Sequence, residues 1–379
     1  MTAMASLNTP PASWAGAQRV TAVACVLAAL VLVVLDAAIA NVALPAISAS
    51  LAVTAAESVH VVTAYQLTLM MALLPCAALG ESLGHRRVYT AGVALFVIAS
   101  ALCAAAPSLP FLVASRALQG LGGAAIMSLG VALLRVALPE QLGRAIGWNA
   151  LAVALASAAG PTVGALVLSH ASWPWLFAVN LPLGALVLLA TRALPRTVGS
   201  ARKLDLVSMG LNAAGLGALI LSAELVLDAP ALAALSLLAG TLALTVLVRR
   251  ELPKPAPLVP LDLLRERSFR GSVIASVSTF IGQSAAMVSL PFYLQHGLHQ
   301  DALHTGLLIT AWPCMVALTA PVTGRFASHG SSAFLCALGG GLLALGLALA
   351  ALWPLAGTPL ALLPFLLLCG AGFGLFQVP

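Results

Sequence analysis

The chain has 379 residues, of which 61% are hydrophobic and 7% are charged, and its formal net charge is +6. Soluble domains carry about 25% charged residues, so this composition excludes a soluble enzyme or a soluble binding domain of any size. It predicts a helical protein that crosses a membrane many times. The positive charge does not indicate a nucleic-acid partner, because the placement of the basic residues along the chain explains it.

The apolar runs predict twelve membrane spans after a short polar arm at residues 1–18. Each run has about 20 residues, the length that an α-helix needs to cross the hydrocarbon core of a bilayer. The connection from Arg249 to Arg270 is the longest and is rich in proline and charge. The predicted spans cover residues 20–45, 58–79, 88–106, 111–134, 145–168, 173–192, 206–227, 231–248, 271–294, 303–324, 333–353 and 360–379.

The basic residues lie almost entirely on one side of these spans. With the N-terminus inside, every lysine and arginine except Arg116 precedes the first span or falls in an inner connection. Basic residues are enriched in the cytoplasmic connections of membrane proteins. The division therefore predicts a multi-pass protein of a bacterial-type cytoplasmic (inner) membrane, with a cytoplasmic N-terminus.

The first span contains a single carboxylate, Asp36, after an apolar run from Val20 to Leu35. An ionised Asp at the centre of a membrane helix costs about 2.5–3.5 kcal/mol on insertion scales, so such residues usually serve a function. An acid that alternates between a protonated and an ionised state is suited to carrying protons. Asn41 adds a second polar group, and Pro45 predicts the end of the helix. The alternative is an Asp held in a structural hydrogen bond.

Arg116 is the one basic residue inside a predicted span, the fourth. Counted from the outer ends of their spans, Arg116 and Asp36 both fall in the outer half of the bilayer. Arg does not lose its proton, so it needs an anion, carbonyl groups or water. If the first and fourth helices touch, Arg116 interacts with Asp36 directly or through water and tunes its proton binding. The alternative is a static ion pair that holds the bundle in one arrangement.

A proline and two glycines, Gly160, Pro161 and Gly164, lie together in the fifth predicted span. The glycine spacing is that of a small-xxx-small face, which lets another helix approach closely. Pro161 removes a backbone hydrogen bond and bends the helix. The pattern predicts a kinked contact seam that closes one end of a cavity.

The connection between the second and third spans carries Glu81, Gly84, Arg86 and Arg87. Gly84 permits a tight turn, and Glu81 is placed to pair with Arg86 or Arg87 or to lie against a helix N-terminus. A weaker copy of this pattern follows at residues 324–330, eight spans later. Two six-span halves would place the copies six spans apart, so two additional helices between the halves are predicted.

Together these motifs resemble the major facilitator superfamily, and within it the fourteen-span drug/proton antiporters. The resemblance runs along nearly the whole chain, and the combination of motifs is more specific than any one of them. The matching positions are Leu35, Asp36, Ile39 and residues 41–45 in the first-helix signature; Arg116, Gln119, Gly120 and Gly122 in R-x-x-Q-G-x-G; Gly160, Pro161 and Gly164 in the antiporter motif; and residues 173–184 in the aromatic signature of the sixth span.

The resemblance implies an all-α membrane protein of the major facilitator superfamily fold, with two six-helix bundles and two extra helices between them. Twelve of the family's fourteen spans are then present, and the chain is expected to be truncated at its C-terminus. The implied divisions are a cytoplasmic arm at 1–18, an N-terminal six-helix bundle at 19–195, two inserted helices at 196–250, a cytoplasmic linker at 251–270 and an incomplete C-terminal bundle at 271–379.

The chain departs from the family in the loop between the second and third spans. Ala77, Glu81 and Ser82 stand where the family has Gly, Asp and Arg, and Ser328 stands in the second copy where an acid is common. These replacements imply a weaker gating network of charges. His60 also stands where the family usually has Trp.

We expect a proton-coupled efflux transporter, an antiporter that moves small, mainly hydrophobic compounds by alternating access. Asp36 would exchange the proton, and Arg116 would tune it. The proton motive force would be the only energy source, with no cofactor, no metal and no enzyme activity. The other expected site residues are Glu81, Gly84, Arg86 and Arg87 with Gly160, Pro161 and Gly164 for gating, and Asn41, Tyr65, Gln119 and Gln283 in the substrate cavity.

Two alternatives fit the same residues less well. The first is a proton-coupled importer of the same fold, against which the antiporter motif argues. The second is a non-transporting membrane receptor or scaffold, which leaves Asp36 and Arg116 unexplained. The expected partners are a small-molecule substrate, protons and the lipid bilayer, and the oligomeric state is left open.

Overall fold

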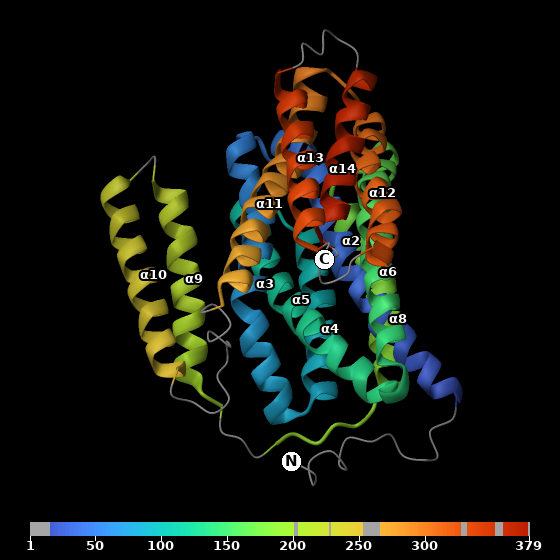
Figure 1. Cartoon of the computed structure of the whole chain (residues 1–379), viewed down its shortest axis with the longest axis vertical. Helices are drawn as coiled ribbons and strands as arrows, with labels where there is room; N and C mark the ends of the chain where they lie inside the picture. Colours follow the sequence, from blue (N-terminus) through green and yellow to red (C-terminus); the bar gives the residue numbers. More distant parts are fainter. Residues whose placement is uncertain are drawn as a thin grey trace.

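The computed structural model describes residues 16–200, 204–226, 229–252, 266–326, 332–352 and 359–377, most of which lie in helices (Figure 1). Four short 3-10 or π segments accompany the α-helices: η2 Pro139–Gln141, η3 Thr191–Ala193, η5 Tyr293–Gly297 and η6 Pro359–Leu362. The α-helices are α2 Gly16–Leu51, α3 Ala55–Leu83, α4 His85–Ala104, α5 Leu109–Ala137, α6 Leu142–His170, α7 Pro174–Ala178, α8 Asn180–Ala190, α9 Leu206–Leu225, α10 Pro230–Glu251, α11 Arg267–Phe292, α12 Ala302–Phe326, α13 Ser332–Leu352 and α14 Leu363–Gln377.

Twelve helical segments within the described residues are long and apolar enough to cross a membrane, and each overlaps one predicted span. The all-α membrane fold expected from the composition is therefore confirmed. Most of the predicted polar arm, most of the linker between α10 and α11, and Ser328 lie outside the described residues.

The first helix is longer than predicted, because Pro45 does not end it. Helix α2 continues to Leu51, and the following residue, Ala52, adopts a left-handed conformation with φ of 53°. A proline removes only one backbone donor from a helix. Leu44 and Ile47, on either side of Pro45, are completely buried, so the packing of this turn outweighs the missing hydrogen bond.

The sixth predicted span is broken into two helices. Helix α7 ends at Ala178 and α8 begins at Asn180, and η3 extends the segment to Ala193. Pro182 has no N–H group for the carbonyl of Ala178, which weakens the helix at this point. The break places Asn180 at the start of α8, with its side chain inside the bundle and 1% of the residue exposed.

Helix α5 is central to the N-terminal half and packs against both α3 and α4. Small residues make this approach possible. A Cβ atom added to Gly120 would meet the carbonyl oxygen of Tyr65 and lie 3.2 Å from the backbone nitrogen of Leu69 on α3. Two apolar clusters fill the space around these helices, one nearer each end of α2.

Helices α11 to α14 form the second group, coloured orange to red in Figure 1. Their core is an apolar cluster in which Trp312 and Leu366 are almost completely buried. Helix α12 packs on α14 within this group and on α6 of the first group, so it joins the two halves.

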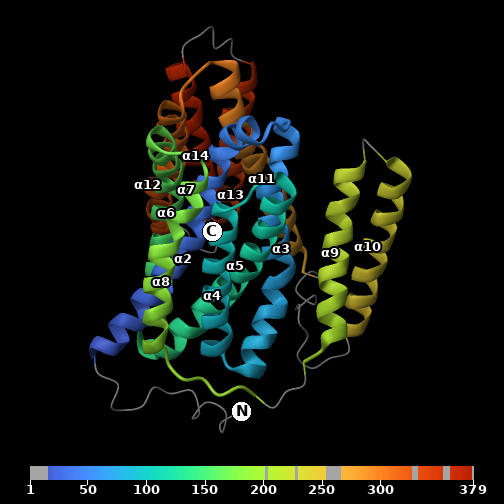
Figure 2. The same ribbon diagram turned by 180° about the vertical axis from the view of Figure 1, so that it is seen from behind.

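Helices α9 and α10 form a hairpin that stands beside the bundle in both views (Figures 1 and 2). The two helices pack mainly on each other, and α9 contacts α3. The Asn212 side chain donates a hydrogen bond to the carbonyl of Met71 at 3.0 Å, and His60 lies 3.9 Å from Glu224. These polar contacts fasten the hairpin to α3.

We expect Gly120→Ala to destabilise the protein, because the new methyl group meets the backbone of α3. Overpacking of this kind costs about 1–3 kcal/mol. Gly147→Ala is the matched control, since a Cβ atom at Gly147 meets nothing within 4 Å and alanine favours a helix. Melting temperatures of the two variants in detergent test this. Equal melting temperatures would show that the approach of α3 and α5 does not depend on Gly120.

Candidate functional site

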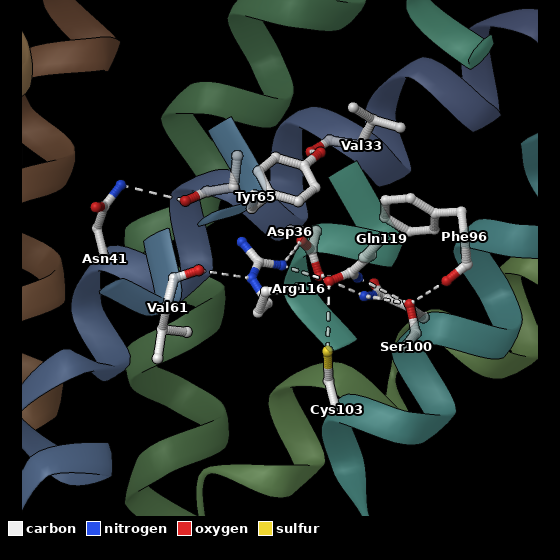
Figure 3. A network of polar contacts seen from close by, with 12 residues as sticks. Val33, Asp36, Asn41, Val61, Tyr65, Phe96, Ser100, Cys103, Arg116 and Gln119 are labelled. Carbon is white, nitrogen blue, oxygen red and sulfur yellow. Dashed lines mark hydrogen bonds and ion pairs between the residues drawn. The ribbon is translucent and has the colours of Figure 1, made fainter. Parts of the chain in front are cut away.

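Polar side chains from five helices meet inside the N-terminal half (Figure 3). The central pair is Asp36 from α2, of which 2% is exposed, and Arg116 from α5, which is completely buried. The surrounding helices are otherwise apolar, so each polar group here depends on its neighbours for hydrogen bonds. The structure thus brings together the two charges that the sequence placed in different spans.

Both oxygens of the Asp36 carboxyl group accept hydrogen bonds. Arg116 donates from Nη1 to Oδ2 at 2.5 Å, and Gln119 donates from Nε2 to Oδ1 at 2.9 Å. Asn180 donates from Nδ2 to Oδ1 at 2.6 Å. A buried carboxylate is tolerated when it is paired and hydrogen-bonded in this way.

The guanidinium group of Arg116 is held on several sides. Its Nε donates to the carbonyl of Val61 at 3.2 Å, and its Nη1 also donates to Oε1 of Gln119 at 2.5 Å. The group stacks over the Tyr65 ring at 4.2 Å and lies 5.5 Å from the Phe177 ring. Aromatic faces stabilise a buried cation, and the attraction increases when the cation is removed from solvent. Its Nη2 has no hydrogen-bond partner, which leaves one donor free inside the bundle.

A second set of contacts orients the groups that touch Asp36. Gln119 donates to the Ser100 hydroxyl at 2.9 Å, and Ser100 donates to the carbonyl of Phe96 at 2.8 Å (Figure 3). The Tyr65 hydroxyl donates to the carbonyl of Val33 at 3.3 Å. These bonds fix the carboxamide of Gln119 so that its nitrogen faces the carboxylate.

Two contributors to this cluster, Asn180 and Ser100, were not among the predicted site residues. Asn180 stands in the aromatic signature of the sixth span, in an otherwise apolar run, and that context is the signal that would have found it. Ser100 carries no comparable signal, because hydroxyl groups in membrane helices commonly bond to their own backbone.

The predicted cavity residues fall into two groups. Tyr65 and Gln119 contact Arg116 and belong to the cluster. Asn41 is partly exposed on α2, where its nitrogen donates to the carbonyl of Ala37 and its Oδ1 is buried without a partner. Gln283 lies on α11, partly exposed, and takes no part in the cluster.

The glycine and proline seam of α6 lies beside Asp36. A Cβ atom at Gly160 would meet the Cβ of Ala38 on α2, and one at Gly164 would lie 3.4 Å from Ile39. On the other side of α6, Pro161 lies against Gly306 of α12. The hydroxyl groups of Thr162 and Thr310 join the same two helices by a hydrogen bond of 2.6 Å.

The loop before α4 does not form the expected pair of Glu81 with Arg86 or Arg87. The Oε1 atom of Glu81 instead lies 3.1 Å from Nε2 of His85, the first residue of α4. Arg86 instead turns away and donates from Nη2 to the carbonyl of Arg192 at 3.1 Å. Gly84 makes the predicted tight turn, with φ of 98°.

Comparison with known proteins identifies the fold and the class. A family model described as Major Facilitator Superfamily matches residues 26–379. The xylose transporter XylE of E. coli, solved in a partially occluded inward open conformation, has a TM-score of 0.61 at 13% identity, with 95% of this chain and 82% of that chain covered. This likeness concerns the fold alone.

Several curated relatives are named as transporters. The "Uncharacterized transporter YebQ" of Escherichia coli K12 is 43% identical over 96% of this chain and 80% of its own length. The "Riboflavin transporter RibZ" of Clostridioides difficile is 31% identical over 80% of this chain and 67% of its own length. The "Multidrug resistance protein Stp" of Mycobacterium tuberculosis is 32% identical over 92% of this chain, which spans 66% of the length of Stp.

We expect Arg116→Gln to destabilise the protein strongly, because it leaves the Asp36 carboxylate buried without its counter-charge. Breaking a buried pair from one side costs about 3–5 kcal/mol. The double variant Asp36→Asn, Arg116→Gln should recover part of this loss, since neither charge is then left unpaired. Unfolding of the purified variants in detergent measures both effects.

The matched control for these variants is Arg250→Gln, which breaks the exposed pair between Arg250 and Asp205 at 3.2 Å. Exposed pairs contribute about 0–1 kcal/mol, so this variant should unfold close to the wild type. A double variant at Asp36 and Arg116 that is no more stable than Arg116→Gln alone would contradict the strong coupling of the two charges.

Proposed function

The chain belongs to the Major Facilitator Superfamily of membrane transporters, and from this premise we propose that it is a proton-coupled exporter of small, mainly hydrophobic compounds. It is a multi-pass protein of the inner membrane and not an enzyme. The observation that carries the proposal is the Asp36 carboxyl group, which is 2% exposed and bound to a fixed guanidinium group. The multidrug resistance protein Stp, 32% identical, supports the direction of transport.

The proposed mechanism assigns the proton to Asp36, because Arg116 keeps its charge at any physiological pH. In the described arrangement three donors from Arg116, Gln119 and Asn180 hydrogen-bond to the carboxyl oxygens of Asp36. A movement of α2 relative to α5 or α8 would remove donors from the carboxylate. A buried carboxylate without donors binds a proton, because burial disfavours its charged form.

The energy available to this exchange is sufficient for export. One proton that moves through 100 mV releases about 2.3 kcal/mol, which supports a concentration ratio of about fifty for one substrate molecule. In the proposed cycle, protonation separates Asp36 from Arg116, and loss of the proton restores the pair. Alternating access then follows from the movement of the two halves, which α12 joins at α6.

The seam at Gly160, Pro161 and Gly164 is proposed to keep protons from crossing without substrate. It lies between α2 and α12, and its contact with Ala38 is two residues from Asp36. A tight contact at this place excludes water from the path beside the carboxyl group. The loop from Glu81 to Arg87 is proposed to bias the protein toward one of its two states.

A second candidate is import of one specific solute. The observation that favours it is the 31% identity to the riboflavin transporter RibZ over 310 residues. The same buried pair would serve a symporter, so the direction of the proton and of the substrate decides between the two.

The placement of the arginines further supports a cytoplasmic N-terminus.

We expect the full chain in proteoliposomes to move a fluorescent hydrophobic cation against its gradient when a pH gradient is imposed. Asp36→Asn should lower proton-driven transport by about tenfold or more, because the side chain no longer exchanges a proton. Glu57→Gln is the matched control, since Glu57 is an exposed capping residue of α3 and glutamine also fills that role.

Each outcome of the transport assay decides one part of the proposal. Full proton-driven export by Asp36→Asn would remove Asp36 from the mechanism. Uptake of riboflavin in the direction of the proton gradient, without export of the cation, would replace the exporter with the importer. Substrate binding without any proton movement would overturn proton coupling itself.

We also expect Gly160→Val to increase the passage of protons without substrate, by about tenfold, because valine pushes α6 away from Ala38. Gly147→Val on the same helix is the control, since nothing lies within 4 Å of its Cβ position. The collapse of an imposed pH gradient in substrate-free liposomes measures the leak. If the Gly160→Val variant holds the pH gradient as well as the wild type and exports normally, the seam is not a proton barrier.

A further inference from the structure

A cavity of about 950 Å³ lies at one end of the N-terminal half, between α4 and the segment that follows α8. Four arginines line it: Arg86 and Arg87 from the first turn of α4, Arg192 from η3, and Arg196 four residues later. No carboxylate is among the lining residues that the structure describes. The cavity is separate from the cluster around Asp36, and it shares Arg86 and Arg87 with the loop that is proposed to bias the two states.

The cavity is a built part of the fold, because hydrogen bonds hold its two sides together. The backbone N–H of Arg86 donates to the Thr197 hydroxyl at 3.2 Å, and that of Ser200 donates to the carbonyl of Glu81 at 2.7 Å. A Cβ atom at Gly84 would lie 2.5 Å from the carbonyl of Thr197, so the loop and the segment are in direct contact. Figure 2 shows this segment running from the end of α8 beneath the bundle.

The positive charge of the cavity is uncompensated within the part of the chain that the structure describes. None of the four arginines forms an ion pair with another described residue. Glu81, the acid in the adjoining loop, contacts His85 at 3.1 Å and is not among the lining residues. The four arginines line one cavity, so their like charges repel each other. Guanidinium groups gathered in this way match the geometry and the charge of phosphate groups.

The deeper wall of the same cavity is apolar. Ala91 and Ala94 of α4 and Leu188 and Leu189 of α8 line it, one or two turns further into the membrane-spanning helices. A charged rim at the end of two spans, with an apolar wall that continues into the bilayer, has the two chemical parts of a phospholipid. Basic pockets between membrane helices bind anionic lipid headgroups in this manner.

We propose that this cavity binds an anionic phospholipid, with Arg86, Arg87, Arg192 and Arg196 around its phosphate groups and its acyl chains along the alanine and leucine wall. Four guanidinium groups are sufficient for two phosphate groups, so a lipid with two phosphates fits best. The bound lipid would neutralise the repulsion among the arginines and fasten α4 to the segment after α8.

The test is binding of cardiolipin to the purified full chain in detergent, measured by native mass spectrometry. Arg192→Gln with Arg196→Gln removes half of the charge and spares the loop residues proposed for gating. We expect this double variant to bind cardiolipin about thirtyfold more weakly than the wild type. Circular dichroism and the melting temperature without lipid verify that the variant is folded.

The matched control is Arg267→Gln with Arg270→Gln, which removes two exposed arginines at the start of α11, outside the cavity. This variant should bind cardiolipin within about twofold of the wild type. An equal loss in both double variants would overturn the proposal, because binding would then depend only on total charge.

Two further measurements separate the sources of the ligand. Phosphatidylcholine should not compete with cardiolipin, because its headgroup carries no net charge. If phosphatidylcholine binds as well as cardiolipin, the cavity is only an apolar groove and the proposal fails. If millimolar inorganic phosphate displaces cardiolipin completely, the site is one for a soluble anion, and the lipid assignment is likewise overturned.

Discussion

The buried pair between Asp36 and Arg116 is the constraint on which the rest of the N-terminal half depends. Neither charge is tolerable alone at this depth, so the surrounding helices supply a donor or an acceptor for nearly every polar atom. Meeting that demand fixes where α2, α3, α5 and α8 approach one another. The break between α7 and α8 is part of this arrangement, since it places the Asn180 amide against the carboxylate. Because these hydrogen bonds come from several helices, a movement of any one of them would remove a partner from the pair.

The seam on α6 connects this cluster to the other half of the molecule. On one face it packs against the turn of α2 that follows Asp36, and on the other it meets α12. A displacement of the second half is therefore transmitted through direct contacts to Ala38, two residues from Asp36. The proposed link between proton binding and the movement of the two halves therefore needs no long relay of side chains.

The sequence was sufficient for the spans and for four members of the cluster, Asp36, Arg116, Tyr65 and Gln119, and insufficient for Asn180 and Ser100. A charge in an apolar run is costly, so Asp36 and Arg116 stand out without any structure. Asn180 and Ser100 do not, because neutral polar residues in spans have many local partners and only the packing shows which they use. The prediction that Pro45 ends the first helix was wrong for a related reason. A proline usually ends a helix, but here the burial of the neighbouring turn outweighs this local effect. The partner of Glu81 could not be predicted either, because Arg86 donates to the carbonyl of Arg192, which is 106 residues away in the sequence.

The α9–α10 hairpin does not change the side of the membrane on which the following chain begins. Its two crossings bring the chain back to the side on which α9 started. Its fastening to the bundle is light, chiefly the Asn212 amide on α3 and the approach of His60 to Glu224. A hairpin adds an even number of membrane crossings, and this one has few polar contacts with the bundle. Its gain or loss during evolution would therefore not invert the membrane orientation of α11 or of the helices after it. Versions of this architecture with and without the hairpin can thus share the same interior chemistry.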